Sequence, residues 1–159
     1  MDQQATIGIH LAAGEFRRLA VQRLAREWGG TEIRIRDRAC RFCDCQILVA
    51  DGGKGLLAYD PCDRPTVELV ALNAFEPRRG IATAPLEDLV HRLQADGYVT
   101  LRLATTNDNL DALRFYQRRG FRIAALRPGA VDDARRVKPA VCYSSLSHRS
   151  TVMTSGSSA

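Results

Sequence analysis

A carboxylate inside an apolar, strand-like run is the first feature of this sequence that could do chemistry. Glu68 stands within 67–72, whose other residues are apolar on both faces of the predicted strand. Burial disfavours the charged form of a carboxyl group and raises its pKa, which makes it a better base near neutral pH. We interpret Glu68 as a candidate general base, against the alternative of a satisfied polar residue near a strand start. Glu76 and Asp88 are weaker candidates.

The same strand runs into a turn whose backbone could bind an anion. The turn, Pro77-Arg78-Arg79-Gly80-Ile81-Ala82-Thr83, leads at once into an amphipathic helix. Backbone N–H groups and the positive end of that helix then point at one place outside the strand end, an arrangement that binds phosphate. The turn lacks both the three glycines of a dinucleotide fingerprint and the Gly-Lys-Ser/Thr of a Walker loop. An ordinary strand-to-helix connection is the alternative.

A second motif follows the next predicted strand. Its residues have the spacing N-x-x-A-x-x-x-Y-x-x-x-G-F, at Asn109, Ala112, Tyr116, Gly120 and Phe121. The segment reads as a helix that Asn107 or Asp108 caps and that runs to about Arg119, with arginines in its last turn and the glycine past its end.

The elements around these motifs alternate between strands and helices. Apolar residues spaced for one helical face predict helices over 15–28, with Phe16, Leu19, Ala20 and Leu24 inward, and after the turn, with Leu86, Leu89, Val90 and Leu93 inward and Gly97 as the stop. Strands are predicted over 6–11, 31–37, 46–50, 55–59, 98–104 and 121–125, and Asp51-Gly52-Gly53 predicts a hairpin. The cysteine-rich connection before residue 46 is expected to be irregular.

Length and composition indicate one ordinary globular domain. The chain has 159 residues, 45% apolar and 26% charged, with a net charge of +5 that comes almost wholly from arginine. A basic balance fits nucleic acid, an acidic substrate or a phosphate-bearing cofactor, and the even spread of the arginines disfavours nucleic acid. No apolar run approaches the roughly 20 residues of a membrane helix, and the N-terminus lacks a signal peptide pattern. We therefore expect a cytoplasmic protein without a membrane partner.

Five cysteines raise the question of a metal site. Cys40, Cys43 and Cys45 are clustered, and with Cys62 they could form a four-thiolate zinc site. Structural zinc sites usually pair two C-x-x-C knuckles, and only Cys40 and Cys43 have that spacing here. We predict reduced, partly buried thiols and no metal.

The chain changes character near its C-terminal end. Residues 144–159 are rich in Ser and Thr and lack periodicity, which predicts a disordered tail after a single domain over 1–143. No clear strand pattern follows 121–125, so the final strand of the sheet is not evident.

The two motifs together resemble those of the GNAT superfamily of N-acetyltransferases, over roughly residues 32–139. The family's first motif, Q/R-x-x-G-x-G/A, is matched at Gly80 and Ala82, with Pro77 in the Gln/Arg position, and the second motif is matched throughout. The segment 105–109 is similar to bacterial members. The resemblance implies an α/β (α+β) fold: a single GNAT-like domain with a central mixed, mostly antiparallel sheet that is flanked by helices and splayed at its central strands.

The resemblance also implies acetyl-CoA as co-substrate and a role for each matched residue. The amides from Arg78 to Thr83 would bind the pyrophosphate, Asn109 the pantetheine arm, and Tyr116 would protonate the leaving thiolate, while Glu68 would take the proton of the amine. The implied cofactor contacts are Leu72, Asn73, Arg78, Arg79, Gly80, Ile81, Ala82, Thr83, Asn107, Asn109 and Ala112. As alternatives, Tyr116 is an aromatic side chain packed on the sheet, and the two arginines are solvated.

The expected function is therefore transfer of an acetyl group from acetyl-CoA to a primary amine by direct attack in a ternary complex. The acceptor would be a small-molecule or peptide amine, and a homodimer is a possible assembly. Two alternatives from other classes are a catalytically inactive CoA-binding regulatory module and, less favoured, a basic nucleic-acid-binding domain.

Overall fold

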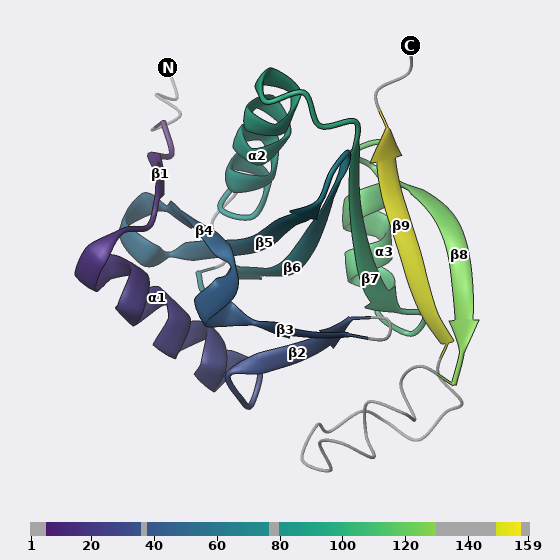
Figure 1. Cartoon of the computed structure of the whole chain (residues 1–159), viewed down its shortest axis with the longest axis horizontal. Helices are drawn as coiled ribbons and strands as arrows, with labels where there is room; N and C mark the ends of the chain where they lie inside the picture. The colour runs from purple at the N-terminus through teal and green to yellow at the C-terminus, as the bar shows by residue number, and fades with distance from the viewer. Residues whose placement is uncertain (1–5, 36–37, 77–79, 130–148, 157–159) are drawn as a thin grey trace.

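The computed structural model of the chain describes residues 6–35, 38–76, 80–129 and 149–156 (Figure 1). Within these ranges the α-helices are α1 (Gly14–Glu27), α2 (Thr83–Ala95) and α3 (Leu110–Gln117). The strands, in chain order, are β1 (Ile9–Leu11), β2 (Glu32–Ile35), β3 (Arg38–Arg41), β4 (Gln46–Ala50), β5 (Gly55–Asp63), β6 (Thr66–Ala74), β7 (Thr100–Thr106), β8 (Arg122–Pro128) and β9 (Arg149–Gly156). Short 3-10 turns, η1 (Phe42–Asp44) and η2 (Asp51–Gly53), flank β4.

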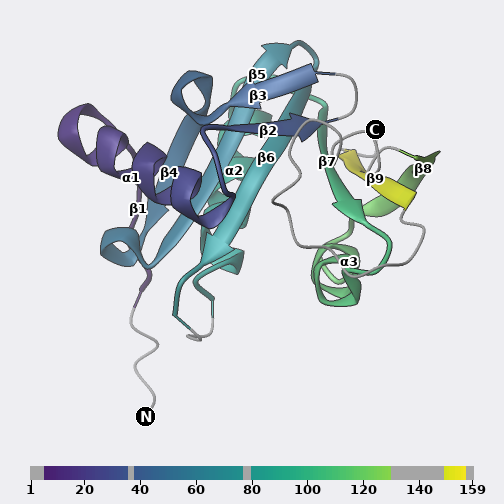
Figure 2. The same ribbon diagram turned by 90° about the horizontal axis from the view of Figure 1, so that it is seen from below.

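One seven-stranded sheet, in the order β1-β4-β5-β6-β7-β9-β8, carries the fold. Only β6 and β7 run parallel; every other neighbouring pair in the sheet is antiparallel. The hairpin β2–β3 and α1 lie on one face of the sheet and α2 lies behind the other (Figure 2). The mixed, mostly antiparallel sheet flanked by helices that the resemblance implied is confirmed.

The sheet opens between its two parallel strands. β6 pairs with β7 only from Thr66 to Leu69, whereas β7 runs on to Thr106 along β9. The register of β6 with β5 also shifts there: Leu69 faces Tyr59 and Ala71 faces Ala58, which leaves Val70 as an extra residue. A bulge of this kind bends and twists the strand that carries it. β6 therefore turns away from β7 beyond the bulge, and the predicted splay is confirmed.

Two apolar cores, one on each face, hold the sheet between its covers. On the first face, α1 and the β2–β3 hairpin pack on inward residues of β4, β5 and β6; Leu24 of α1, Phe42 of η1 and Ile47 of β4 are among the buried residues there. On the second face, α2 and α3 pack through the Leu86, Leu89 and Leu93 stripe and through Tyr116 and Phe121. Because successive side chains of a strand point to opposite faces, β6 with its apolar run contributes to both cores.

The buried face of α1 differs from the predicted one. Ala20 and Leu24 are buried as expected, but Phe16 is 69% exposed and Leu19 is 52% exposed. The helix is rotated so that Arg17 faces the protein instead, and its guanidinium donates to the carbonyl oxygens of Cys45, at 2.7 Å, and Cys43, at 2.6 Å. A pattern of apolar spacing does not predict these polar contacts to the connection between β3 and β4.

Three further expectations are wrong. The cysteine-rich stretch is not irregular throughout, because Arg38–Arg41 forms β3 and pairs with β2. The cap of α3 is Asn109, two residues after Asn107, since its side-chain oxygen accepts the N–H of Ala112 at 3.1 Å. The predicted disorder from residue 144 does not hold for Arg149–Gly156, which forms β9.

β9 pairs with β7 on one side and with β8 on the other. Backbone hydrogen bonds to these two neighbours therefore stabilise a strand that its own Ser/Thr-rich sequence does not predict. The predicted division at residue 143 falls outside the described residues, as do 144–148 and 157–159. In the described part of the chain, no helix has the length and hydropathy that crossing a bilayer requires.

Two of the three cysteines whose side chains the structure describes are buried. Cys40 and Cys45 are buried and Cys43 is exposed, while the side chain of Cys62 lies outside the described residues. The Cys45 thiol donates to the carbonyl oxygen of Arg41 at 3.3 Å. Burial, and to a smaller degree the nearby Asp60 carboxylate, raises the pKa of the Cys45 thiol from 9.0 to about 12, so this thiol stays neutral at physiological pH. Among the described residues, no group of three or more potential ligands is placed to hold a metal ion.

This shift makes stability fall in alkaline solution. Below pH 9 the Cys45 thiol is protonated in both the folded and the unfolded chain; between pH 9 and about 12 only the unfolded chain loses the proton. The free energy of unfolding should then fall by up to about 1.4 kcal/mol per pH unit from this group. Urea unfolding from about pH 8 to pH 11 measures that slope. Cys45→Ala should start from lower stability but fall less steeply, and an equal slope would contradict the assignment.

Candidate functional site

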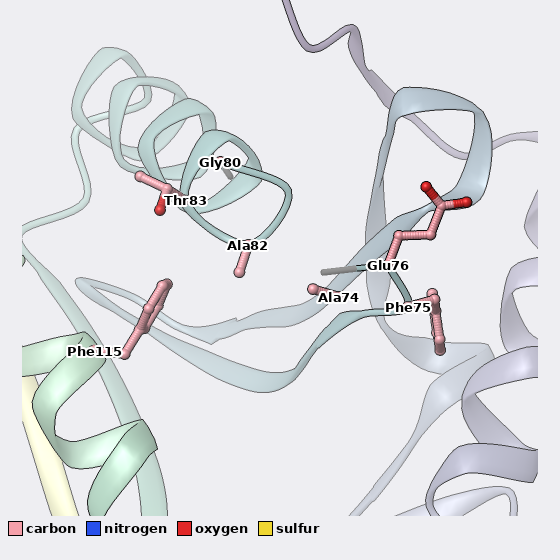
Figure 3. Close-up of a pocket in the computed structure, with 7 residues that line it drawn as sticks. All are labelled: Ala74, Phe75, Glu76, Gly80, Ala82, Thr83 and Phe115. Carbon is pink, nitrogen blue, oxygen red and sulfur yellow. The ribbon is translucent and has the colours of Figure 1, made fainter. Parts of the chain in front are cut away.

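A hollow of about 500 Å³ lies at the end of β6, where the sheet has opened. It is lined by the strand end, the first turn of α2 and one residue of α3: Ala74, Phe75, Glu76, Gly80, Ala82, Thr83 and Phe115. Figure 3 shows Phe115 reaching from α3 toward Thr83 on α2, while the Glu76 side chain points away from that helix. The Glu76 carboxylate lies 3.7 Å from the Lys54 ammonium. The predicted anion-binding turn therefore borders a real cavity.

Gly80 shapes the start of α2. Its φ of +90° belongs to the left-handed region that favours glycine, and an added Cβ would lie 2.9 Å from Ile7 Cδ1. Its carbonyl accepts the N–H of Ala84 at 2.8 Å, which begins the helical turn. The buried Ile81 anchors this turn on β5, where Gly55 has no side chain to keep the two backbones apart.

The electrostatics of this turn suit an anion. The first turn of α2 has no acidic residue and its N-terminus has no side-chain cap. The positive end of the helix dipole lies at this start. In the first turn, the Ala84 N–H already bonds the Gly80 carbonyl and Pro85 has no N–H, so the dipole is the main feature that favours an anion in the hollow. Pro77, Arg78 and Arg79, two of which were predicted to add charge here, lie outside the described residues.

Several predicted cofactor contacts lie elsewhere or have other partners. The Asn73 side-chain oxygen accepts the Trp28 indole N–H at 2.8 Å, which ties β6 to α1. The Asn109 oxygen is occupied by its capping bond to Ala112. Leu72 is half-buried against the second core, Ile81 is fully buried, and Asn107 is exposed after β7. Gly80, Ala82 and Thr83 are the predicted residues that the hollow brings together.

Glu68 is buried, as the sequence indicated, but it has a cationic partner. It is 2% exposed, and the Arg102 Nε donates to its Oε2 at 2.6 Å. Asp60, Glu68 and Arg102 occupy one rung across β5, β6 and β7, and Arg38 pairs with Asp60 at 2.9 Å. The sequence indicated the burial of Glu68 but did not identify this cationic partner. The ion pair joins β6 to β7 just before the bulge.

Glu68 and the hollow lie at different levels of the sheet. Ala74 lies six positions after Glu68 in β6, which corresponds to roughly 20 Å along a strand. The rung of Glu68 is within the paired part of β6 and β7, and the hollow is beyond it. A ligand that touches both must extend along the opening between the strands.

Tyr116 is packed in the second core. It is 8% exposed and makes edge contacts with Phe115, at 5.1 Å between ring centroids, and with Phe121, at 5.3 Å. Burial raises the pKa of its phenol, and the nearby Arg119 opposes that rise only in part. The hydroxyl is therefore protonated at neutral pH. Its neighbour Phe115, and not Tyr116 itself, lines the hollow.

Sequence reasoning missed Phe115 and Arg119. The Arg119 guanidinium stacks on the Phe115 ring, 3.6 Å from its centroid, and donates to the Phe115 carbonyl at 2.8 Å and to the Thr83 hydroxyl. Arg119 was interpreted only as a cation favourable at the end of a helix. The available signal was the spacing of Phe115 and Arg119, four residues apart, because side chains at i and i+4 lie side by side on a helix.

Comparisons with known proteins agree with this architecture. The sequence profile of the Acetyltransferase (GNAT) family matches residues 52–121, which span β5 to α3 and the residue after its C-terminal turn. The uncharacterized protein YdhI of Bacillus subtilis (strain 168) is 34% identical over 121 residues, which are 74% of this chain and 75% of that protein.

Solved structures show the same fold. An IAA acetyltransferase from Bacillus cereus superposes with a TM-score of 0.71 at 17% identity, over 95% of this chain and 99% of that one. A GNAT family acetyltransferase from Elizabethkingia anophelis with acetyl-CoA bound superposes with a TM-score of 0.71 at 19% identity, over 96% and 99%. At such identities the likeness concerns the arrangement of helices and strands.

The Arg102–Glu68 pair should stabilise the junction of β6 and β7. Arg102→Met removes the cation from a buried carboxylate, a change that typically costs about 3–5 kcal/mol. The same change in a Glu68→Gln background should cost clearly less, because the buried charge is then absent. Urea unfolding of the four proteins measures the coupling. Equal costs of Arg102→Met in both backgrounds would show that the two side chains do not interact energetically.

Proposed function

Because the chain belongs to the acetyltransferase (GNAT) family, we propose that it transfers an acetyl group from acetyl-CoA to a primary amine. One observation carries the proposal: the opening between β6 and β7 ends in a hollow bordered by Gly80 and by a helix start without acidic residues. A diphosphate at that helix start would gain a favourable helix dipole. The rest of an extended cofactor would then follow the unpaired edge of β6 toward the bulge.

When bound, acetyl-CoA supplies a thioester that a neutral amine attacks directly, so that a C–N bond forms and the C–S bond breaks. The chain's residues would position the reactants and move two protons. We assign the phenol of Tyr116 to protonate the leaving thiolate, and the carboxylate of Glu68 to take the proton that the amine loses, directly or through water. Its partner Arg102 would hold the carboxylate in place.

A second candidate function is a CoA-binding module without catalysis. The observation that favours it is the placement of both assigned residues: neither Glu68 nor Tyr116 lines the hollow, and each is engaged with other side chains. The acceptor stays open between small-molecule and peptide amines. A cytoplasmic location and a homodimer stay predictions from the sequence.

Acetyl-CoA should stabilise the folded protein through the Gly80 turn. At a hundredfold excess over the dissociation constant, binding to the folded state contributes about 2.7 kcal/mol, which a thermal shift titration detects. Gly80→Ala should abolish the saturable shift, because a side chain at a φ of +90° distorts the turn.

Gly97→Ala is the matched control. Gly97 also has a positive φ, of +77°, but it lies past the other end of α2 and its added Cβ meets nothing within 4 Å. It should lower the melting temperature and leave the acetyl-CoA shift intact. A folded wild-type protein without any shift would rule out the cofactor, and equal shifts for both variants would place its phosphates elsewhere.

Catalysis should depend on Tyr116 and Glu68. Tyr116→Phe and Glu68→Gln should each lower kcat by about 10²- to 10⁴-fold with an accepted amine, while the acetyl-CoA thermal shift persists. Tyr59→Phe is the control, because Tyr59 is a buried tyrosine of the same core. Wild-type protein that binds acetyl-CoA yet acetylates none of spermidine, lysine and a short peptide would favour the module.

A further inference from the structure

Arg119 bridges two helices at the rim of the hollow. It lies just past α3, and its guanidinium donates to the Thr83 hydroxyl at the first residue of α2. It also donates to the Phe115 carbonyl and stacks on the Phe115 ring. Both residues that Arg119 holds line the hollow. The guanidinium is therefore held beside the cavity by contacts that do not neutralise its charge.

The charge of Arg119 is not balanced by an acid in the described part of the chain. Arg102 pairs with Glu68 and Arg38 with Asp60, whereas Arg119, like Arg17 and Arg23, forms no ion pair with an acid among the described residues. Its Nε is also buried and donates to no described residue. A buried, unused donor on an uncompensated cation is unfavourable unless an acceptor arrives.

The neighbouring helix end makes the need for an anion stronger. Arg119 reaches the first residue of α2, where the helix dipole is positive, and no acidic residue occupies that first turn. Glu76, the acid in the lining, has its carboxylate 3.7 Å from the Lys54 ammonium. Two positive features thus meet at one edge of a cavity with room for a ligand group.

We propose that Arg119 is a phosphate-binding residue of the acetyl-CoA site. On binding, its guanidinium would exchange the Thr83 hydroxyl for a phosphate oxygen, while the Phe115 ring keeps the side chain in place. The inference rests on the proposed function, because acetyl-CoA supplies the phosphate. The diphosphate and the 3′-phosphate offer the same chemistry, and the guanidinium fork suits either.

Equilibrium titrations at fixed salt test this proposal with three ligands: acetyl-CoA, acetyl-3′-dephospho-CoA and acetyl-pantetheine, which has no phosphate. Arg119→Met should weaken acetyl-CoA binding by roughly 10- to 100-fold, in line with a lost charge-assisted hydrogen bond. It should leave the affinity for acetyl-pantetheine unchanged. Arg118→Met is the matched control, since Arg118 is an exposed neighbour, and it should bind all three ligands like the wild type.

The dephospho ligand identifies the phosphate. A loss of affinity that persists with acetyl-3′-dephospho-CoA assigns Arg119 to the diphosphate, and a loss that disappears assigns it to the 3′-phosphate; either supports the proposal. An Arg119→Met protein that binds acetyl-CoA within twofold of the wild type overturns it. So does an equal loss with acetyl-pantetheine, which would mean that Arg119 only shapes the cavity.

Two controls keep the outcomes distinct. If Arg119→Met does not fold, Arg119→Gln keeps a donor for the Thr83 hydroxyl without the charge, and the same losses are expected of it. Wild-type protein that is folded but binds none of the three ligands would refute the proposed function itself. Wild-type binding with unaffected variants would refute only the role of Arg119.

Discussion

The end of pairing between β6 and β7 is the constraint on which the rest of the structure depends. Two parallel strands that stayed paired would close the sheet, and the end of β6 would offer no space to a ligand. The extra residue at Val70 changes the course of β6 immediately after the last rung shared with β7. Beyond that point the strand has an edge that β7 does not cover, and the start of α2 is carried to one side of the opening and α3 to the other. The hollow follows from this divergence and not from the helices alone.

Two arginines act in contrasting ways around this opening. Arg102 lies where the strands are still joined, and its charge is neutralised by the buried carboxylate of Glu68. Arg119 lies where they have parted, and aromatic and neutral oxygen contacts hold it without neutralising it. A buried ion pair adds little net stability over an apolar pair of similar size, because the cost of desolvation offsets the attraction. Arg102 therefore fits a role in holding β6 and β7 together just before they part. Arg119 keeps its positive charge unneutralised beside the hollow.

Much of this could be predicted from the sequence, and the failures have physical causes. The Leu86, Leu89 and Leu93 stripe, the hairpin before β5 and the glycine turn before α2 are local patterns, and each was found. The partner of Glu68 is 34 residues away, so only the register of β6 and β7 could bring Arg102 to it. Asn109 took the capping position because a side-chain oxygen at that point satisfies a free N–H of the helix start. β9 has a composition typical of a disordered tail, and it forms a strand because its backbone hydrogen-bonds to both β7 and β8.

The place of β9 has a consequence for the order of events during synthesis. Although it is the last described strand in the chain, it lies between β7 and β8 in the sheet. A nascent chain that has emerged as far as β8 can already form the half of the sheet from β1 to β7, since those strands pair among themselves. β8 at that stage has no described strand to pair with, and one edge of β7 is bare. Exposed edges of this kind invite pairing with other chains. The half of the domain that carries α3, and with it one wall of the hollow, is therefore completed only when the ribosome has delivered residues beyond 148.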